Sequence, residues 1–229
     1  MRLVQLRMAD GSRCVAAGLQ DDVRRIDGIT SIYELANAAL KESATLEECT
    51  RRRVSDERVD LEAAETEGRL LAPIDHPDPA HLMLSGTGLT HLGSAQMRDR
   101  MHREAAGEHV TDSMRMFRMG LEGGKPAGGG AGAQPEWFYK GDGACLVGTA
   151  QPLALPAFAG DGGEEPELAG VYLIDGRGNP RRLGFCLANE FSDHVTEHGN
   201  YLWLAHSKLR PAALGPELLT EIPGDIRAT

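Results

Sequence analysis

Long hydrophobic runs are missing from this sequence of 229 residues. No apolar stretch approaches the roughly 18 residues that a membrane-spanning helix needs. The N-terminal stretch Met-Arg-Leu-Val-Gln-Leu-Arg alternates polar and apolar residues and contains no apolar core of a signal peptide. The sequence therefore predicts neither membrane insertion nor export, and a cytoplasmic protein is expected.

Cysteine and positive charge are also in short supply. The four cysteines (Cys14, Cys49, Cys145 and Cys186) include no Cys-x-x-Cys pair, which favours reduced, partly buried thiols over a disulfide framework. Lysine and arginine number 24 against 34 aspartates and glutamates, a formal charge of −10. Since nucleic acids and membrane surfaces are polyanions, this excess of negative charge counts against both as partners.

The first 70 residues predict a small α+β unit. Segments 2–8 and 13–19 alternate around an Asp-Gly turn and predict a hairpin, to which 23–26 adds a third strand. Ser/Thr-x-x-Glu patterns beginning at Ser31 and Thr45 are typical of capped helix starts, so a helix is expected after each.

A stiff, proline-rich passage at residues 73–79 (Pro-Ile-Asp-His-Pro-Asp-Pro) predicts a domain boundary. Residues 62–68 are expected to be the linker that leads to it. The sequence thus predicts a small α+β N-terminal domain over residues 1–72 and a second domain over residues 73–229.

The second part predicts a mixed, β-rich domain. A helix is expected over 94–106, and the glycine-rich run 120–135 is expected to be a loop or flap. Short strands are predicted over 81–85 (a buried strand), 137–140, 145–147, 151–155, 168–174 and 181–188. The last two are the strongest, and the turn residues 175–179 between them predict a hairpin.

Three glutamates are expected at one end of this hairpin. Glu165 and Glu167 stand two residues apart at the start of a strand and so share a face, while Glu190 follows the partner strand. The two strand lengths counted from the turn differ, which a bulge or a twist would absorb. Three converging carboxylates repel one another unless a cation lies between them, and Mg²⁺ prefers oxygen ligands. A solvated acidic loop is the competing interpretation.

Two passages of the hairpin resemble the fumarylacetoacetate hydrolase family. Glu-Pro-Glu-Leu-Ala-Gly-Val, from Glu165, is similar to the family's Glu-x-Glu-Leu-Ala, and Gly-Phe-Cys-Leu-Ala-Asn-Glu-Phe-Ser, from Gly184, is similar to its Gly-Tyr and Asn-Asp-x-Ser. The resemblance implies an α+β protein with a mixed, β-rich catalytic domain of roll or sandwich type. It also implies that Glu165, Glu167 and Glu190 bind Mg²⁺, with Mn²⁺ or Ca²⁺ as substitutes.

Further segments resemble the family in the same order. Trp137–Lys140 resembles its aromatic-x-Lys segment, and His206–Lys208, with the Leu-Gly-Pro that follows, resembles its Lys-Ser…Pro segment. Gly86–His91 resembles the glycine-containing strand end that begins the catalytic domain. The resemblance implies three substrate-binding residues: Gly88, Ser94 (alternatively a helix cap) and Lys208.

Catalytic roles are implied for Lys208, Lys140 and His91. Lys208 would stabilise an enolate or transfer a proton, and Lys140 would pair with the substrate carboxylate or with a metal-binding glutamate. His91 would protonate a leaving hydroxyl, or is a loop histidine without a chemical role. His194 and Glu197 follow Glu190 and are candidates for residues that contact the metal-binding glutamates rather than the metal itself.

The chain departs from the family pattern at three points. Glu190 stands where most relatives have Asp, and Ser94 and Met97 occupy the positions of a His-x-x-Glu dyad that activates water in relatives. The sequence ends at Thr229, before further strands and a Thr-Gly-Thr turn of the family. A truncated product or an incomplete active site is therefore expected.

The resemblance implies an enzyme that uses a metal ion to stabilise the enolate of a 2-oxo acid. The missing dyad, and a resemblance to the subgroup that includes 2-keto-3-deoxypentonate dehydratases, favour dehydration of a 2-keto-3-deoxy sugar acid in pentose catabolism. A C–C hydrolase of acylpyruvates or diketo acids, an oxaloacetate decarboxylase and a truncated, non-catalytic family member are the alternatives. The resemblance also implies a homodimer.

Overall fold

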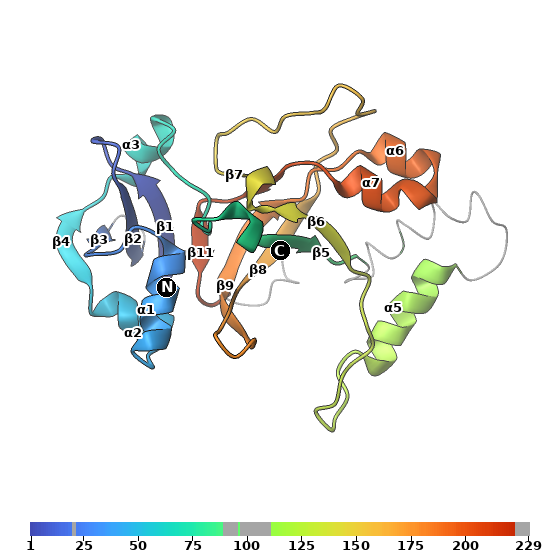
Figure 1. Ribbon diagram of the computed structural model, residues 1–229, viewed down its shortest axis with the longest axis horizontal. Coiled ribbons are helices and arrows are strands. Elements are labelled where there is room, and N and C mark those ends of the chain that lie inside the picture. The colour runs from blue at the N-terminus through green and yellow to red at the C-terminus, as the bar shows by residue number, and fades with distance from the viewer. Residues whose placement is uncertain (20–21, 89–95, 97–110, 223–229) are drawn as a thin grey trace.

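The computed structural model describes residues 1–19, 22–88, 96 and 111–222 (Figure 1). The molecule is rich in sheet: one nine-stranded sheet has the order β4-β3-β2-β1-β11-β9-β10-β7, with β8 paired to β9, and β5 and β6 form a second sheet. The large sheet is mixed, because β10 and β7 are parallel while the other pairs are antiparallel.

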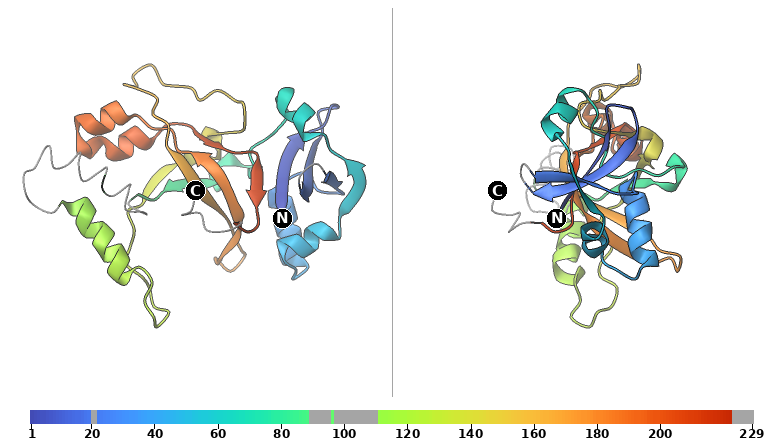
Figure 2. Two further views of the ribbon diagram at one scale, coloured as in Figure 1. Left: turned by 180° about the vertical axis from the view of Figure 1, so that it is seen from behind. Right: turned by 90° about the vertical axis from the view of Figure 1, so that its left-hand side faces the viewer.

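The N-terminal elements confirm the predicted hairpin, third strand and two helices. They gather at one end of the molecule (Figure 2). In chain order they are β1 (Arg2–Arg7), β2 (Arg13–Leu19), β3 (Asp22–Ile26), α1 (Ile32–Lys41), α2 (Leu46–Arg51), β4 (Val54–Arg58) and α3 (Leu61–Thr66). Both helices begin where the capping patterns place them, after Ser31 and Thr45.

The expected linker over residues 62–68 is wrong, because helix α3 occupies most of it. Asp60 caps this helix and accepts a hydrogen bond from the backbone N–H of Ala63 at 2.9 Å. The Glu-Ala-Ala-Glu run has high helix propensity, and Ala64 is fully buried against the hairpin, in a cluster with Leu6 and Leu70. Propensity, a cap and one buried contact together stabilise a helix that polarity alone does not suggest.

A fully buried glutamine ties the N-terminal sheet to helix α1 and to the chain that leaves it. The Gln5 side chain accepts from the Ile32 N–H at 2.6 Å and donates to the Ala72 carbonyl at 2.6 Å. We expect Gln5→Leu to lower the free energy of unfolding by about 1–3 kcal/mol, since it leaves the buried Ile32 N–H and the partly buried Ala72 carbonyl without their Gln5 partner. Urea denaturation measures this, with Gln134→Leu at an exposed position as control; equal midpoints for the two variants would refute the role.

The remaining elements build the second half of the sheet and the end of the molecule away from β4. They are η1 (Pro79–His81), β5 (Met83–Gly86), α5 (Asp112–Gly123), β6 (Phe138–Asp142), η2 (Gly143–Cys145), β7 (Leu146–Val147), β8 (Pro166–Ile174), β9 (Pro180–Asn189), α6 (His194–Gly199), η3 (Tyr201–Trp203), α7 (Leu204–Lys208), β10 (Ala212–Leu214) and β11 (Glu217–Leu219). Strand β11 lies between β1 and β9 and joins the two halves of the sheet (Figure 1).

Several expectations for this half need correction. Strand β5 is not buried, since Met83 is 62% exposed. Residues 151–155 form no strand, because Pro152 and the following Pro156 supply no backbone donors for a ladder. Helix α5 extends into the expected loop 120–135, although the rest of that run has no helix or strand.

The hairpin of β8 and β9 has the predicted turn, and it contains a bulge, one of the two alternatives expected for the unequal strand lengths. Glu167 pairs with Ala188 near its open end, and the register shifts between Val171 and Tyr172. This one-residue shift compensates for the unequal strand lengths. The start of β8 and the end of β9 therefore lie side by side.

All four cysteines are free, as predicted, and three of them are buried. Within the described residues, no helix is long and apolar enough to cross a membrane. The predicted helix over 94–106 lies almost entirely outside the described residues.

Candidate metal centre

The open end of the β8–β9 hairpin carries three carboxylates. Glu165 and Glu167 flank the first residue of β8, and Glu190 directly follows β9. The backbone holds them in place: the Glu190 N–H donates to the Glu165 carbonyl at 3.0 Å, and the Asn189 side chain accepts from the Glu165 N–H at 3.1 Å. One ligand atom from each glutamate lies within 4.8 Å of the others. The three side chains can therefore reach a common cation.

Lys208, the last residue of helix α7, brings a buried positive charge to this cluster. Its side chain is only 2% exposed, and its Nζ lies 2.6 Å from Glu165 Oε1 and 3.2 Å from Glu190 Oε1. The ammonium also lies 5.4 Å from the centre of the Phe138 ring, a cation–π distance. The lysine thus contacts two of the three carboxylates that sequence reasoning placed at the site.

These charges shift one another's pKa values in opposite directions. Burial raises the pKa of Glu165, but hydrogen bonds and charge from Lys208 outweigh it and lower the pKa to about 2. For Glu190, burial dominates and the pKa is raised. Burial lowers the pKa of Lys208, yet the charges of Glu190 and Glu165 outweigh it, so its pKa is raised and the ammonium form is favoured.

A histidine and a serine side chain contact two of the three carboxylates, those of Glu165 and Glu190. His194 Nε2 lies 2.9 Å from Glu165 Oε1, the same oxygen that Lys208 contacts. The Ser192 hydroxyl donates to Glu190 Oε1 at 3.3 Å. Contacts of this kind fix the orientation of ligating side chains in metalloproteins.

Lys140, on strand β6, is as deeply buried as Lys208 but has different partners from those expected. Its ammonium donates to the backbone carbonyls of Phe191, at 2.5 Å, and Lys208, at 2.7 Å. Burial lowers its pKa to about 8, which the charge of Glu190 partly opposes. Lys140 therefore connects the segments that carry Glu190 and Lys208, rather than pairing with a glutamate.

The structure describes only some of the remaining predicted residues. His91, Ser94 and Met97 lie outside the described residues. Gly88 follows strand β5 and is half-buried. Gly86, two residues earlier, begins the Gly86–His91 segment of the resemblance but was given no role of its own: a Cβ there would lie 2.2 Å from the Phe138 ring and 2.9 Å from Glu190 Oε2. Glycine at this strand end allows close packing beside Glu190.

Sequence reasoning also missed a buried ion pair next to the cluster. Asp193 and Arg210 have side chains 0% and 2% exposed and lie 2.9 Å apart. Asp193 also caps helix α6 by accepting from the Thr196 N–H at 2.9 Å, and it accepts from the Gly160 N–H at 2.9 Å. The Ser-Asp-His run after Glu190, typical of a helix start, was the available signal.

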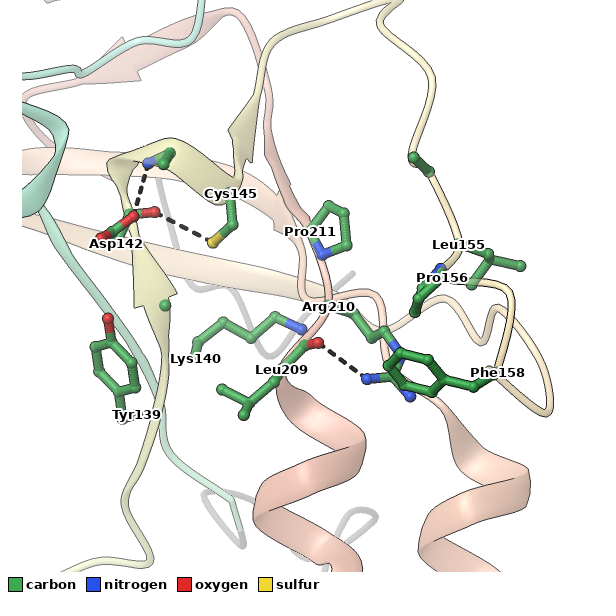
Figure 3. A pocket seen from close by; sticks show the side chains of 13 residues that line it. Tyr139, Lys140, Asp142, Cys145, Leu155, Pro156, Phe158, Leu209, Arg210 and Pro211 are labelled. Carbon is green, nitrogen blue, oxygen red and sulfur yellow. Dashed lines mark hydrogen bonds between the residues drawn. The ribbon is translucent and has the colours of Figure 1, made fainter.

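A hollow of about 600 Å³ is lined by Lys140 and its neighbours (Figure 3). Tyr139 and Cys145 line it from β6 and the turn that follows, and Leu155 and Phe158 line it from the loop before β8. The three glutamates do not line this hollow. Lys140 thus lines the hollow and also donates hydrogen bonds to the segments that carry Glu190 and Lys208.

The arrangement of strands and helices defines the class of fold. The chain has a fumarylacetoacetate hydrolase-like fold, as the resemblance implied. It is similar to the apo form of a 2-keto-3-deoxy-D-arabinonate dehydratase, with 22% identity and a TM-score of 0.61 over 96% of this chain and 67% of that one. No protein-family model and no curated protein matches the chain.

Two further structures have the same fold. One is the 2-keto-3-deoxy-D-arabinonate dehydratase complexed with magnesium and 2,5-dioxopentanoate, with 22% identity and a TM-score of 0.60 over 96% of this chain and 66% of that one. The other is a 2-hydroxyhepta-2,4-diene-1,7-dioate isomerase from Mycobacterium marinum, with 19% identity and a TM-score of 0.53 over 97% of this chain and 67% of that one. The chain spans about two thirds of the length of these proteins.

Proposed function

We propose that this protein is an enzyme that binds Mg²⁺ through Glu165, Glu167 and Glu190 and acts on a small 2-oxo acid. The observation that carries the proposal is the approach of the three ligand atoms to within 4.8 Å of one another, beside a lysine that is almost fully buried. An all-oxygen set of carboxylates fits Mg²⁺, and Mn²⁺ or Ca²⁺ as substitutes, better than a soft metal.

The residues around the cluster suit the stabilisation of an enolate. A bound divalent cation would act as a Lewis acid toward the carboxylate and keto oxygens of a 2-oxo acid. Lys208, held as an ammonium by its neighbours, places positive charge where an enolate would develop negative charge. Lys140 holds together the backbone segments that carry Lys208 and Glu190. In this proposal Gly88 and Ser94 bind substrate, and His91 protonates the leaving group.

Dehydration of a 2-keto-3-deoxy sugar acid is the reaction we favour. A five-carbon substrate would lose its C4 hydroxyl as water after proton removal at C3, which leaves a C3=C4 double bond and a C5 alcohol. Tautomerisation, with one C5 hydrogen and the C5 hydroxyl hydrogen moved to C3 and C4, would then yield 2,5-dioxopentanoate. That compound is the ligand of one similar structure, which supports this choice. Isomerisation of an unsaturated diacid is the second candidate, because another similar structure carries that name.

Organisation and location are part of the same proposal. We infer that residues 1–72 form an N-terminal domain and residues 73–229 the metal-binding domain. The hydrophobic cluster around Leu6 and Ala64 contains residues of the first part alone, whereas the larger cluster packs residues of both parts together. The protein is proposed to act in the cytoplasm as a homodimer.

Assays on 2-oxo acids with and without Mg²⁺ test the reaction. We expect 2-keto-3-deoxypentonates to yield 2,5-dioxopentanoate with Mg²⁺ and not after chelation by EDTA. Acylpyruvates, oxaloacetate and an unsaturated diacid complete the panel. Cleavage of diketo acids without turnover of keto-deoxy acids would refute dehydration, and metal binding without any turnover would favour the non-catalytic alternative.

A further inference from the structure

Glu197, on helix α6, is a third carboxylate beside Lys208. Its Oε2 lies 3.7 Å from the Lys208 Nζ, and its side chain is 14% exposed. It does not belong to the group of Glu165, Glu167 and Glu190 whose ligand atoms converge. Lys208 therefore faces three carboxylates, of which two are proposed metal ligands and one is not.

The position of Lys208 makes this third carboxylate important. Glu165 and Glu190 contact the ammonium directly, so a divalent cation at the cluster would compete with Lys208 for their charge. An ammonium buried as deeply as this one is costly without a counter-charge. Among the described residues, Glu197 is the carboxylate that would remain to balance Lys208 once the cation binds Glu165 and Glu190.

Helix α6 is fixed to the segment that carries Lys208. The Asp193 N–H, at the start of α6, donates to the carbonyl of Ser207 at 3.1 Å. The Asp193 carboxylate caps the helix through Thr196 and accepts from Arg210, two residues after Lys208. Contacts on both sides of Lys208 thus hold it to the start of helix α6, the helix that carries Glu197.

We propose that Glu197 is a positioning residue that keeps the Lys208 ammonium beside the metal centre when a divalent cation is bound. The inference rests on the proposed metal site. It predicts that Glu197 affects metal binding through Lys208: without Glu197, Lys208 holds Glu165 and Glu190 more tightly and competes more strongly with the cation.

A double-mutant cycle on metal affinity tests the proposal without an activity assay. Isothermal titration with Mn²⁺ is performed on the wild type, Glu197→Gln, Lys208→Met and the double variant. Glu197→Gln is expected to weaken Mn²⁺ binding roughly 10-fold in the wild-type background. The same change is expected to cost less than about 3-fold when Lys208 is Met, because the competing ammonium is gone.

Two further variants make the result decisive. Glu197→Asp keeps the charge and is expected to retain affinity within about 3-fold of wild type, a readout that also serves if Lys208→Met does not fold. Glu164→Gln removes the same charge at an exposed position next to Glu165 and is expected to change affinity less than about 2-fold.

The possible failures are distinguishable. An equal effect of Glu197→Gln in both backgrounds, equal losses for Glu197→Asp and Glu197→Gln, or no effect at all would overturn the role of Glu197 and leave the metal site standing. A wild type that binds no Mn²⁺ would overturn the proposed metal site and this inference together.

Discussion

Glu190→Gln is expected to weaken Mg²⁺ binding more than about 100-fold. Loss of a contact behind a metal ligand typically costs 10–100-fold in affinity, and loss of the ligand itself removes both a bond and a charge. Glutamine has nearly the volume of glutamate and leaves two carboxylates in place of three, so the fold is expected to persist. Calorimetric titration with Mg²⁺ measures the affinity directly.

Thermal melts provide the second readout for this variant. At Mg²⁺ concentrations of about 100 times the wild-type dissociation constant, the wild type gains about 2.7 kcal/mol of stability by mass action, and Glu190→Gln should gain less than about 0.4 kcal/mol. Glu164→Gln, which removes a charge at an exposed neighbouring position, should behave as the wild type. Undiminished binding by Glu190→Gln would show that Glu190 is no ligand.

Asp193→Ala is expected to lower the free energy of unfolding by about 3–5 kcal/mol, the largest stability effect that we predict. The substitution leaves the Arg210 guanidinium buried without its counter-charge, which is the costly way to break such a pair. It also removes the cap of helix α6 and the acceptor for the Gly160 N–H. Urea denaturation at pH 7 measures the loss.

Asp60→Ala is the matched control, because Asp60 also caps a helix but is exposed and pairs with no buried cation. Removal of such a cap alone costs about 1 kcal/mol. If Asp193→Ala costs no more than Asp60→Ala, the buried pair contributes nothing beyond capping.

The same pair gives a pH dependence with a definite sign. Burial raises the pKa of Asp193, but hydrogen bonds from Thr196, Gly160 and Arg210 outweigh it, so the folded-state pKa lies below the unfolded one. Its contribution to stability is therefore complete above the unfolded pKa of about 3.9 and is lost as the pH falls toward the lower folded value. The stability difference between wild type and Asp193→Ala should be constant from pH 5 to 7 (about one unit above that pKa and higher) and shrink at lower pH.

Local patterns predicted the hairpin and the convergence of the three glutamates at its end, and the family resemblance favoured a metal site there over a solvated acidic loop. Strand periodicity puts Glu165 and Glu167 on one face, and the turn at 175–179 returns the chain so that Glu190 reaches them. The helix starts after Ser31 and Thr45 could also be predicted from local patterns, since each depends on a side chain and a backbone N–H three residues apart.

Contacts between distant segments were not predictable in the same way. Lys208 meets Glu165 across 43 residues of chain, and Lys140 meets the Lys208 carbonyl across 68. No spacing rule relates such positions, because their approach depends on how β6, α6 and α7 pack. The pairing of β1 with β11 joins the two ends of the described chain, and the sequence does not predict it for the same reason. The expected linker was wrong because the Asp60 cap, the helix propensity of the Glu-Ala-Ala-Glu run and the burial of Ala64 together stabilise a helix there.

The most direct test of the central claim is a crystal structure of the protein grown with Mn²⁺, with anomalous diffraction recorded at the manganese edge. The metal site predicts one strong anomalous peak within about 2.5 Å of carboxylate oxygens of Glu165, Glu167 and Glu190. A peak elsewhere, or an empty position between the three glutamates at millimolar Mn²⁺, would contradict it.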